Sequence, residues 1–194
     1  MKWSSIQKDM MEYDVTMPYI RMMAGPVDYT PGAMRNASKK DFKDIYYNPM
    51  SQGTRCHQLA AYVVHDSPLT MLADNPTIYK REQECTDFII SIPNKGIEET
   101  RVLQGKVGES IIMARRAGTS WYIGGMTDWT AREITLDFDF LDNGNYEVIL
   151  FKDGINADKQ AEDYKQEQFT ITPASKKKIR MASGGGFAMT ITKK

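Results

Sequence analysis

The stretch RMMAGPVDYTPG, residues 21–32, places three polar side chains directly before a turn. Asp28, Tyr29 and Thr30 follow a run of aliphatic and small residues, and a Pro-Gly pair then turns the chain. At the end of a barrel strand, where substrate-contacting groups gather, a carboxylate, a phenol and a hydroxyl would suit the hydroxyls of a sugar. The alternative, which spacing alone favours slightly, is that Asp28 or Thr30 bonds the backbone of its own turn.

Acid–base chemistry on a glycosidic bond would need a second carboxylate that converges on Asp28. Glu82 and Glu84 are two residues apart on an expected helix, so they face in different directions. Glu98 and Glu99 lie in a linker. All four are better explained as solvated surface charges, so no catalytic residue is assigned within this sequence.

Histidine and cysteine spacing gives no sign of a metal site or a nucleophile. His57 and His65 share one expected helix without an HExxH pattern or a third ligand, so we interpret them as structural or exposed side chains. Cys56 and Cys85 have no metal-type spacing, and two buried free thiols are favoured over a disulfide. No GxSxG motif supports a nucleophilic serine.

Three further motifs have simpler explanations than ligand binding. DGINAD, residues 153–158, lacks the central glycine and final glutamate of a calcium loop and is predicted to be a hairpin loop. SGGGFAM, residues 183–189, leads into a strand without GK[ST], which indicates a bulge or a close backbone approach. SKKKIR, residues 175–180, is typical of a solvated strand edge.

The aromatic residues of SWYIGGMTDWT could stack on sugar rings. In a β-sandwich, however, large aromatic side chains on alternating strand positions usually belong to the core. We assign Trp121 to the core and leave the role of Trp129 open. An exposed row of Trp129 and Tyr122 on a concave face would favour a sugar-binding surface.

Residues 1–92 follow the pattern of an α/β or α-helical segment. The run MPYIRMMAG, residues 17–25, is mostly apolar and bounded by Pro18 and Gly25, which predicts a short buried parallel strand. Residues 35–49 are polar and predict a loop or a short helix.

Two helices are predicted in the rest of this segment. Residues 51–68 keep apolar side chains at helical spacing, with Ser51 as the N-cap and Pro68 as the end. Residues 75–93 begin with Asn75 as a cap and with proline at the first helical position.

After residue 93 the hydrophobic pattern changes to period two. About seven short strands separated by turn signals predict an antiparallel β-sandwich. The predicted strands are residues 100–108, 110–118, 120–129, 133–141, 146–154, 167–173 and 187–193. Asn143-Gly144 and Asp153-Gly154 are dipeptides that favour hairpin turns, and Ala117-Gly118 is a third turn signal.

The expected fold class is therefore α+β, with two parts. One parallel strand and two or three helices cannot close a (β/α)8 barrel, which takes about 250 residues. We predict that residues 1–92 are the last strand–helix segment of such a barrel, which is incomplete here, and that residues 93–194 form a C-terminal antiparallel β-sandwich domain.

Composition limits the classes of partner. The 194 residues are 41% hydrophobic and 26% charged, and 25 basic residues balance 25 acidic ones. A balanced chain has no general attraction to nucleic acid or to an anionic membrane, so neither is expected as a partner. No apolar run approaches the roughly 18 residues of a membrane helix, and the N-terminus lacks the apolar region of a signal peptide.

Six segments, found in order across nearly the whole chain, resemble glycoside hydrolase family 97. They are DVTMPYIRMMAGPVDYTPGAM, NPMSQGTRCHQLAAYVV, REQECTDFI, ETRVLQGKVGE, WYIGGMTDWTARE and LFKDGINADKQAEDYK. The resemblance implies an α-glucosidase or α-galactosidase of a gut-type bacterium, acting on oligosaccharides in the periplasm or outside the cell. It also implies an N-terminal β-sandwich, a central (β/α)8 barrel that holds calcium in its active site, and a C-terminal β-sandwich.

What the resemblance implies for this chain is a supporting role. The catalytic carboxylates and calcium ligands of the family correspond to positions before Met1, so no catalytic or metal residue is assigned here and the chain alone is expected to be inactive. Asp28, Tyr29 and Thr30 would support the wall of the sugar pocket, and the sandwich could join two copies. The competing hypothesis is a non-catalytic β-sandwich that binds sugars or mediates oligomerisation.

Overall fold

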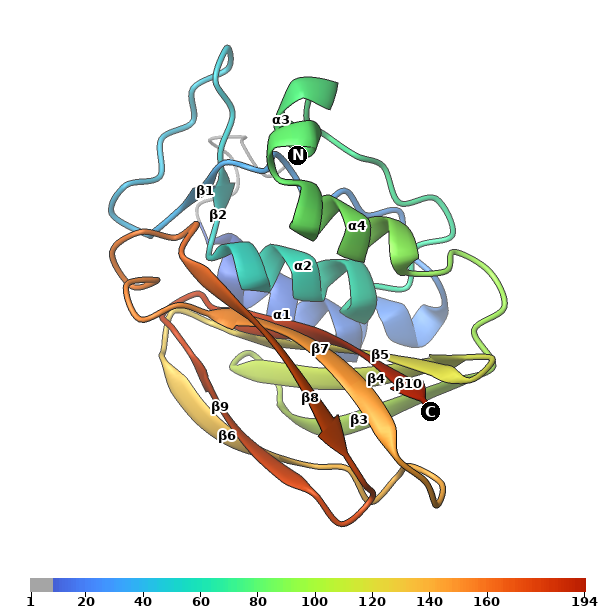
Figure 1. Ribbon diagram of the computed structural model, residues 1–194. Coiled ribbons are helices and arrows are strands. Elements are labelled where there is room, and N and C mark those ends of the chain that lie inside the picture. The colour runs from blue at the N-terminus through green and yellow to red at the C-terminus, as the bar shows by residue number, and fades with distance from the viewer. Residues whose placement is uncertain (1–8) are drawn as a thin grey trace.

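The computed structural model describes residues 9–194 and shows an α+β chain in three layers, with helices, a six-stranded sheet and a two-stranded sheet (Figure 1). The helical elements are α1 (Met10–Ile20), η1 (Met22–Ala24), α2 (Arg55–Val64), α3 (Pro76–Arg81) and α4 (Gln83–Ser91). The strands are β1 (Asn36–Ala37), β2 (Ser51–Gln52), β3 (Glu99–Lys106), β4 (Ser110–Ala117), β5 (Ser120–Thr127), β6 (Arg132–Asp137), β7 (Tyr146–Asp153), β8 (Tyr164–Ile171), β9 (Lys176–Met181) and β10 (Gly186–Lys193). None of the helices in this described part is long and apolar enough to cross a membrane.

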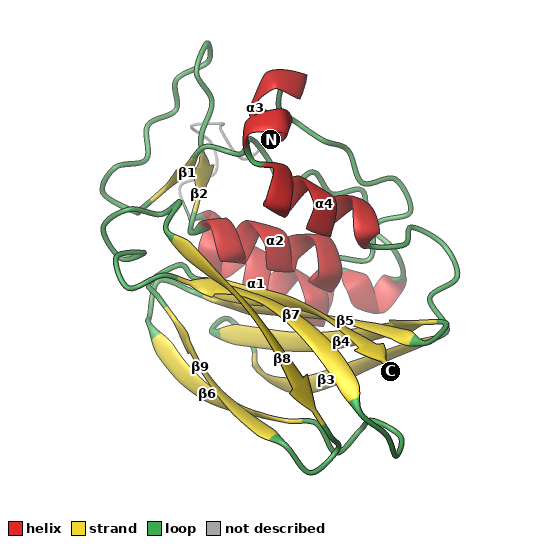
Figure 2. Ribbon diagram, in the orientation of Figure 1, coloured by secondary structure: helices red, strands yellow, loops and turns green. Residues whose placement is uncertain are grey.

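The two larger β layers form the sandwich that the period-two pattern predicts. The six-stranded sheet has the order β3-β4-β5-β10-β7-β8, and each neighbouring pair is antiparallel. β6 and β9 form the second, antiparallel sheet. Figure 2 shows the helices on one face of the large sheet and β6 and β9 on the other.

The space between the two sheets holds the main hydrophobic core. Alternation along β6 and the residues after it buries Leu136 and Phe138 and leaves Thr135 and Asp139 exposed, as the sequence predicts. Trp121 is also buried in this core, which confirms its assignment. The sandwich is therefore held together by apolar burial, the dominant favourable term in folding.

The opposite face of the large sheet is covered by helices. α2 packs on β5 and β10, and α1 packs beside it on β4 and β5. Gly124 on β5 permits this approach, because a Cβ atom there would lie 2.7 Å from the Ala60 carbonyl oxygen and 3.0 Å from Val63 Cβ. The helical layer and the sandwich thus share buried surface through the central sheet.

The predicted strand at residues 17–25 is wrong, because most of this run belongs to α1 and η1. Asp9 caps α1 by accepting a hydrogen bond from the Glu12 backbone N–H at 3.3 Å. Pro18 lies inside the helix, where proline normally removes a bond to the carbonyl four residues earlier. That carbonyl belongs to Asp14, and it lies 3.1 Å from His65 Nε2, which donates to it instead.

The helix at residues 51–68 is confirmed, but its ends differ from the prediction. Ser51 belongs to β2, and its hydroxyl donates to the Ala33 carbonyl at 2.7 Å. Thr54 caps α2, which ends at Val64, before Pro68. A short parallel pair, β1 with β2, therefore occupies positions that sequence spacing assigned to a loop and a helix.

Asn75 caps the next helix as predicted, with its side chain accepting from the Ile78 N–H at 3.1 Å. Glu82 divides the predicted helix at residues 75–93 into α3 and α4, because its backbone leaves helical geometry. The resulting bend turns Glu82 toward Arg55 of α2, with which it forms an ion pair of 2.6 Å.

The predicted turns are confirmed in part. Ala117-Gly118 joins β4 to β5 in a hairpin. Asn143-Gly144 instead connects strands of different sheets, and Asp153-Gly154 opens the longer loop between β7 and β8. The basic run at residues 175–180 lies largely in β9, where exposed Lys178 and Arg180 flank buried Ile179. A glycine run can approach backbone closely, and Gly186 does so against His57 of α2.

The compensation of Pro18 by His65 gives a prediction about stability. His65→Phe should lower the free energy of unfolding by about 1–3 kcal/mol, because the buried Asp14 carbonyl loses this donor. Adding Pro18→Ala should recover most of that loss, since the new N–H of residue 18 can bond the same carbonyl. Urea unfolding of the two single variants and the double variant measures the coupling. Equal effects of Pro18→Ala in both backgrounds would contradict the compensation.

Candidate functional site

The structure separates the three residues of the predicted sugar-pocket wall. They lie on an extended segment between η1 and β1, where Asp28 is exposed, Thr30 is half-buried and Tyr29 is buried. The Tyr29 ring packs edge-on against His65 with centroids 3.9 Å apart. Tyr29 therefore belongs to the interior of the helical layer, while a pocket role for all three side chains stays a prediction.

Tyr29 leads into a buried polar network between the helices and the sandwich. Its hydroxyl donates to Asp14 Oδ1 at 2.6 Å, and Asp14 Oδ2 lies 3.3 Å from His57 Nε2. His57 Nδ1 is 3.2 Å from the Gly185 carbonyl oxygen, which can only accept, so this nitrogen carries a proton. Burial, together with the Asp14 charge, raises the pKa of Tyr29 well above its ordinary value and keeps the phenol a donor.

Asp153, at the end of β7, is the second centre of this network. Its Oδ1 accepts from the Thr54 hydroxyl at 2.6 Å, and its Oδ2 accepts from the backbone N–H groups of Ala182 and Gly186 at 2.8 and 2.9 Å. Burial raises the pKa of Asp153 to about 6, although these donors favour the charged form. One carboxyl group thus connects α2, β7 and the turn between β9 and β10.

The first turn of α2 is satisfied largely by the sandwich. Backbone N–H groups at a helix start have no partner within the helix. The Thr54 N–H donates to the Gly184 carbonyl at 2.9 Å, and the Arg55 N–H donates to the Ala161 carbonyl at 2.7 Å. The Thr54 side chain then accepts from the His57 N–H at 3.1 Å. These bonds fix where α2 starts on the sheet.

Arg55 forms a third connection, within the helical layer. Its side chain is 1% exposed, yet it pairs with Glu82 at 2.6 Å and donates to Asn36 Oδ1 at 2.7 Å. A further bond of 2.6 Å reaches the Met34 carbonyl. A buried guanidinium needs such partners, because an unpaired charge inside a protein is costly. Arg55 therefore joins α2, the start of α4 and β1.

None of these groups is placed for catalysis on a substrate. Asp14 and His57 are fully buried, so an oligosaccharide cannot reach them. Because each polar atom of the Asp153 carboxyl is already used by protein donors, the network is built to hold layers together. The network therefore positions the helices on the sheet and takes no part in a reaction.

The burial of the histidine and cysteine side chains agrees with the structural interpretation of the histidines and confirms two buried free thiols. His57 and His65 are both buried structural side chains. Cys56 and Cys85 are buried free thiols. Within residues 9–194, no group of three or more His, Cys, Asp or Glu side chains could hold a metal ion.

The four glutamates considered as acid–base groups have structural partners. Glu84 accepts from the Tyr164 hydroxyl at 3.0 Å, and Glu98 and Glu99 pair with Arg116. Glu82 is 27% exposed and pairs with buried Arg55, so it is a half-buried structural charge rather than a fully solvated one.

The aromatic pair that could have formed an exposed row is also separated. Trp129 packs against Gly184 and donates from Nε1 to Asp9 Oδ1 at 2.9 Å. Tyr122 lies instead on the helix-facing side of β5, where it lines a groove beside α4 with Phe88. Tyr122 therefore lies with Phe88 in an open groove and not in an exposed row with Trp129.

Sequence reasoning did not find the residues that organise this interface. Asp153 stands in an Asp-Gly dipeptide, which favours a turn, and Arg55 stands in a helix as an ordinary basic residue. Asp14 lies in α1, a helix that was not predicted because a strand was expected at residues 17–25. No local signal in the sequence marks these three as buried, since their partners are distant along the chain.

Comparison with known proteins places the chain in a family. Residues 96–192 match the family described as glycosyl-hydrolase 97 C-terminal, oligomerisation. The chain belongs to glycoside hydrolase family 97. It is also 54% identical over 191 residues to a retaining α-galactosidase of Bacteroides thetaiotaomicron, covering 98% of this chain and 29% of that protein.

Solved structures with the same fold include an enzyme of this family. A family 97 enzyme from Pseudoalteromonas sp. strain K8, determined with acarbose, gives a TM-score of 0.84 at 33% identity, covering 94% of this chain and 28% of that chain. A β-arabinopyranosidase gives a TM-score of 0.77 at 21% identity, covering 97% of this chain and 29% of that chain, which supports the fold alone. This family 97 chain therefore spans less than a third of the length of these relatives.

Asp153 yields a stability prediction in this family 97 chain. Asp153→Ala should lower the free energy of unfolding by about 3 kcal/mol, because it leaves two buried N–H groups and the Thr54 hydroxyl without this acceptor. Asp153→Asn should cost less, since its amide oxygen can still accept from Ala182 and Gly186. Urea unfolding measures both, and equal losses would contradict the hydrogen-bonding role.

The pH dependence of the same pair of proteins gives a second test. The pKa of Asp153 is raised in the folded state from 3.8 to about 6, so its contribution is fully present below 3.8 and is lost as pH rises through 6. The stability advantage of the wild type over Asp153→Asn should therefore shrink between about pH 4 and 7. An advantage that grows with pH would contradict the raised pKa.

Proposed function

We propose that this chain is the C-terminal part of a longer α-glycosidase that cleaves α-galactosidic or α-glucosidic bonds of oligosaccharides. The observation that carries the proposal is the 54% identity to a retaining α-galactosidase over 98% of the chain. Because that relative is named an α-galactosidase, the identity supports an α-galactosidic substrate more than an α-glucosidic one. The complete enzyme would act in the periplasm or outside the cell.

The pair β1 and β2 supports the proposal that residues 1–92 complete a (β/α)8 barrel. The two strands are parallel, with Asn36 opposite Ser51, and α2 follows β2 after two residues. Parallel strands occur almost only in sheets with further neighbours and covering helices. A two-stranded parallel pair followed directly by a helix is what the end of a barrel would leave in this segment.

Exposed apolar side chains in the helical layer support a larger partner surface as well. Met23 is 83% exposed, and it belongs to a set that lies around the end of α1 and the loop after α2. The Val27 N–H donates to the Asp66 carbonyl at 2.8 Å, which holds these two segments together. The set is Ile20, Met23, Leu69, Met71 and Leu72. Exposed apolar side chains that gather on neighbouring segments mark an interaction site, and we assign this one to the upstream part of the enzyme.

The catalytic groups would lie in that upstream part. The complete enzyme would use a pair of carboxylates, and calcium would supply charge stabilisation in its active site. The described residues do not fit a calcium site, since they contain no cluster of acidic ligands. The chain itself would brace the barrel through α2 and the Asp153 network.

Self-association is the second part of the proposal. The matching family is described as an oligomerisation region, and the match covers the sandwich strands from β3 to Thr192 of β10. β3 is an end strand of the large sheet, and Val102 on it is 60% exposed. An end strand leaves backbone N–H and C=O groups open to pairing with another chain, and Val102 adds an exposed apolar side chain there. We therefore place the contact between two copies at β3.

A chimera tests the catalytic part of the proposal. This chain would replace the matching 29% of the Bacteroides α-galactosidase. Hydrolysis of p-nitrophenyl α-galactoside should stay within about tenfold of the parent enzyme, which corresponds to about 1.4 kcal/mol.

The controls are the upstream part of the parent enzyme alone and this chain alone, and both should show no turnover. A soluble chimera without activity would contradict the proposal, as would clear turnover of p-nitrophenyl α-galactoside or α-glucoside by this chain alone.

Sedimentation velocity tests the association of two copies. The chain should sediment as a dimer at micromolar concentration, and Val102→Lys should shift it to the monomer by placing a charge at the contact. Ile155→Lys is the matched control, because Ile155 is 90% exposed but lies in the loop between β7 and β8. A dimer unaffected by Val102→Lys would rule out β3 as the contact.

A further inference from the structure

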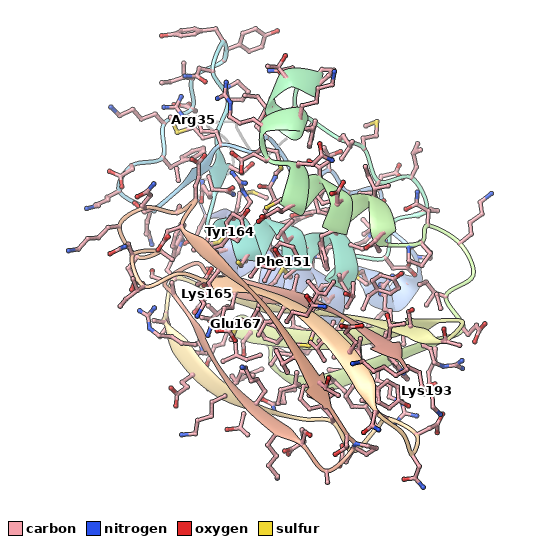
Figure 3. All side chains as sticks on the ribbon, viewed as in Figure 1. Arg35, Phe151, Tyr164, Lys165, Glu167 and Lys193 are labelled. Atoms are coloured by element: carbon pink, nitrogen blue, oxygen red, sulfur yellow. The ribbon has the colours of Figure 1, made fainter. Side chains whose placement is uncertain are left out.

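A groove lies between α4 and the part of the large sheet that α2 leaves uncovered. Its volume is about 350 Å³, within the range of sites that hold small ligands. One wall is α4, with Phe88 and Asp87, and the floor comes from β5, β10, β7 and β8. Figure 3 shows Phe151 and Tyr164 on this helix-facing side of the sheet, next to α2 and α4.

Along the strands, the residues that form the floor of the groove change from small ones beneath α2 to larger ones at the open end. Beneath α2, opposite residues of β5 and β10 are Gly124 and Ala188, which leave room for the helix. Two residues further along β10, and so on the same face, Thr190 lies between Tyr122 on β5 and Ile149 on β7. Strand alternation places all of these side chains on the helix-facing side. The open end therefore presents an aromatic ring and an aliphatic side chain with hydroxyls between them.

The polar groups of the groove can both donate and accept. Ser91, Thr190 and Tyr122 contribute hydroxyls and Gln166 contributes an amide. Ser91 Oγ donates to the Phe88 carbonyl at 2.7 Å, so its lone pairs can accept from a ligand. An apolar floor with a few convergent polar groups is the usual composition of a small-molecule site.

Charge narrows the class of ligand. Among the described lining residues there are two carboxylates, Glu84 and Asp87, and no lysine or arginine. An anionic ligand such as a phosphate would meet only like charge. Each carboxylate already has a protein donor on one oxygen, from Tyr164 to Glu84 and from Gln83 to Asp87. The other oxygen of each can accept a hydroxyl of a neutral ligand.

We propose that this groove binds one or two units of a neutral oligosaccharide. The C–H face of a sugar ring would pack on Tyr122 and Ile149, and its hydroxyls would donate to Glu84 and Asp87 and exchange bonds with the hydroxyls of the floor. A polyhydroxylated ring matches both halves of this surface. A purely apolar ligand would leave the carboxylates unsatisfied.

Nuclear magnetic resonance titration of the full 194-residue chain tests the site. Maltotriose and raffinose, each up to about 20 mM, should give saturable shifts of the amides around Tyr122, Thr190 and Phe88, with a dissociation constant of about 1 mM for one of them. Only the choice of α-linked probes rests on the proposed function. The titration uses this chain without the upstream part. It can therefore fail while the chimera is active, and it can succeed while the chimera is inactive.

Variants at exposed positions keep the fold and separate the outcomes. Thr192→Trp fills the groove and should abolish the shifts, while Thr170→Trp, on the same face two strands away, should leave them unchanged. Asp87→Asn should weaken binding about threefold to tenfold, the loss of one charged hydrogen bond. Absence of saturable shifts, shifts that survive Thr192→Trp, or shifts with spermidine but with neither sugar would overturn the proposal.

Discussion

The Asp153 carboxyl accepts three hydrogen bonds at the point where α2 begins, and the position of the helical layer over the sheet depends on this contact. The first backbone N–H groups of α2 bond to carbonyls of the sandwich, so the start of the helix cannot shift without losing them. Apolar burial supplies most of the attraction between the layers, but it has no preferred direction. The polar bonds select one register of α2 on the sheet.

The helical layer is in turn fixed by side chains that supply hydrogen-bond or ion-pair partners to buried groups on other elements. Pro18 cannot donate within α1, and His65 donates to the Asp14 carbonyl that the N–H of residue 18 would normally reach. Arg55 is buried, and Glu82 and Asn36 supply its partners. Because every such compensation connects two elements, the layer behaves as a unit joined to the sandwich. A rigid connection of this kind suits a segment whose proposed role is to brace a catalytic barrel.

The same arrangement decides where a ligand can and cannot reach. The polar network under α2 is closed to solvent, and its atoms are used by protein partners. Beside α4 the helices no longer cover the sheet, and polar side chains lie next to Tyr122 and Ile149 in an open groove. Burial therefore separates a part of the interface that holds the fold from a part that can bind.

Seven of the eight sandwich strands within residues 9–194 could be predicted from the sequence, while β9 was missed because its basic run was interpreted as a solvated edge beside a strand. Alternation along β6 and β7 depends only on neighbouring residues, because every second side chain of a strand faces the same side. The caps at Asn75 and the turn at Ala117-Gly118 are local in the same way. The family resemblance also rested on short segments that can be compared one by one, and the match over residues 96–192 confirms it.

The conformation of residues 17–25 and the identity of the buried polar residues were decided by tertiary structure. Proline disfavours a helix unless a distant donor satisfies the freed carbonyl, and His65 lies 51 positions from the Asp14 carbonyl that it reaches. Asp153 and Thr54 meet across 99 positions. The sequence by itself determined the periodicity of the elements and the family. Tertiary structure decided which polar groups are buried together, because their hydrogen bonds join residues far apart in the chain.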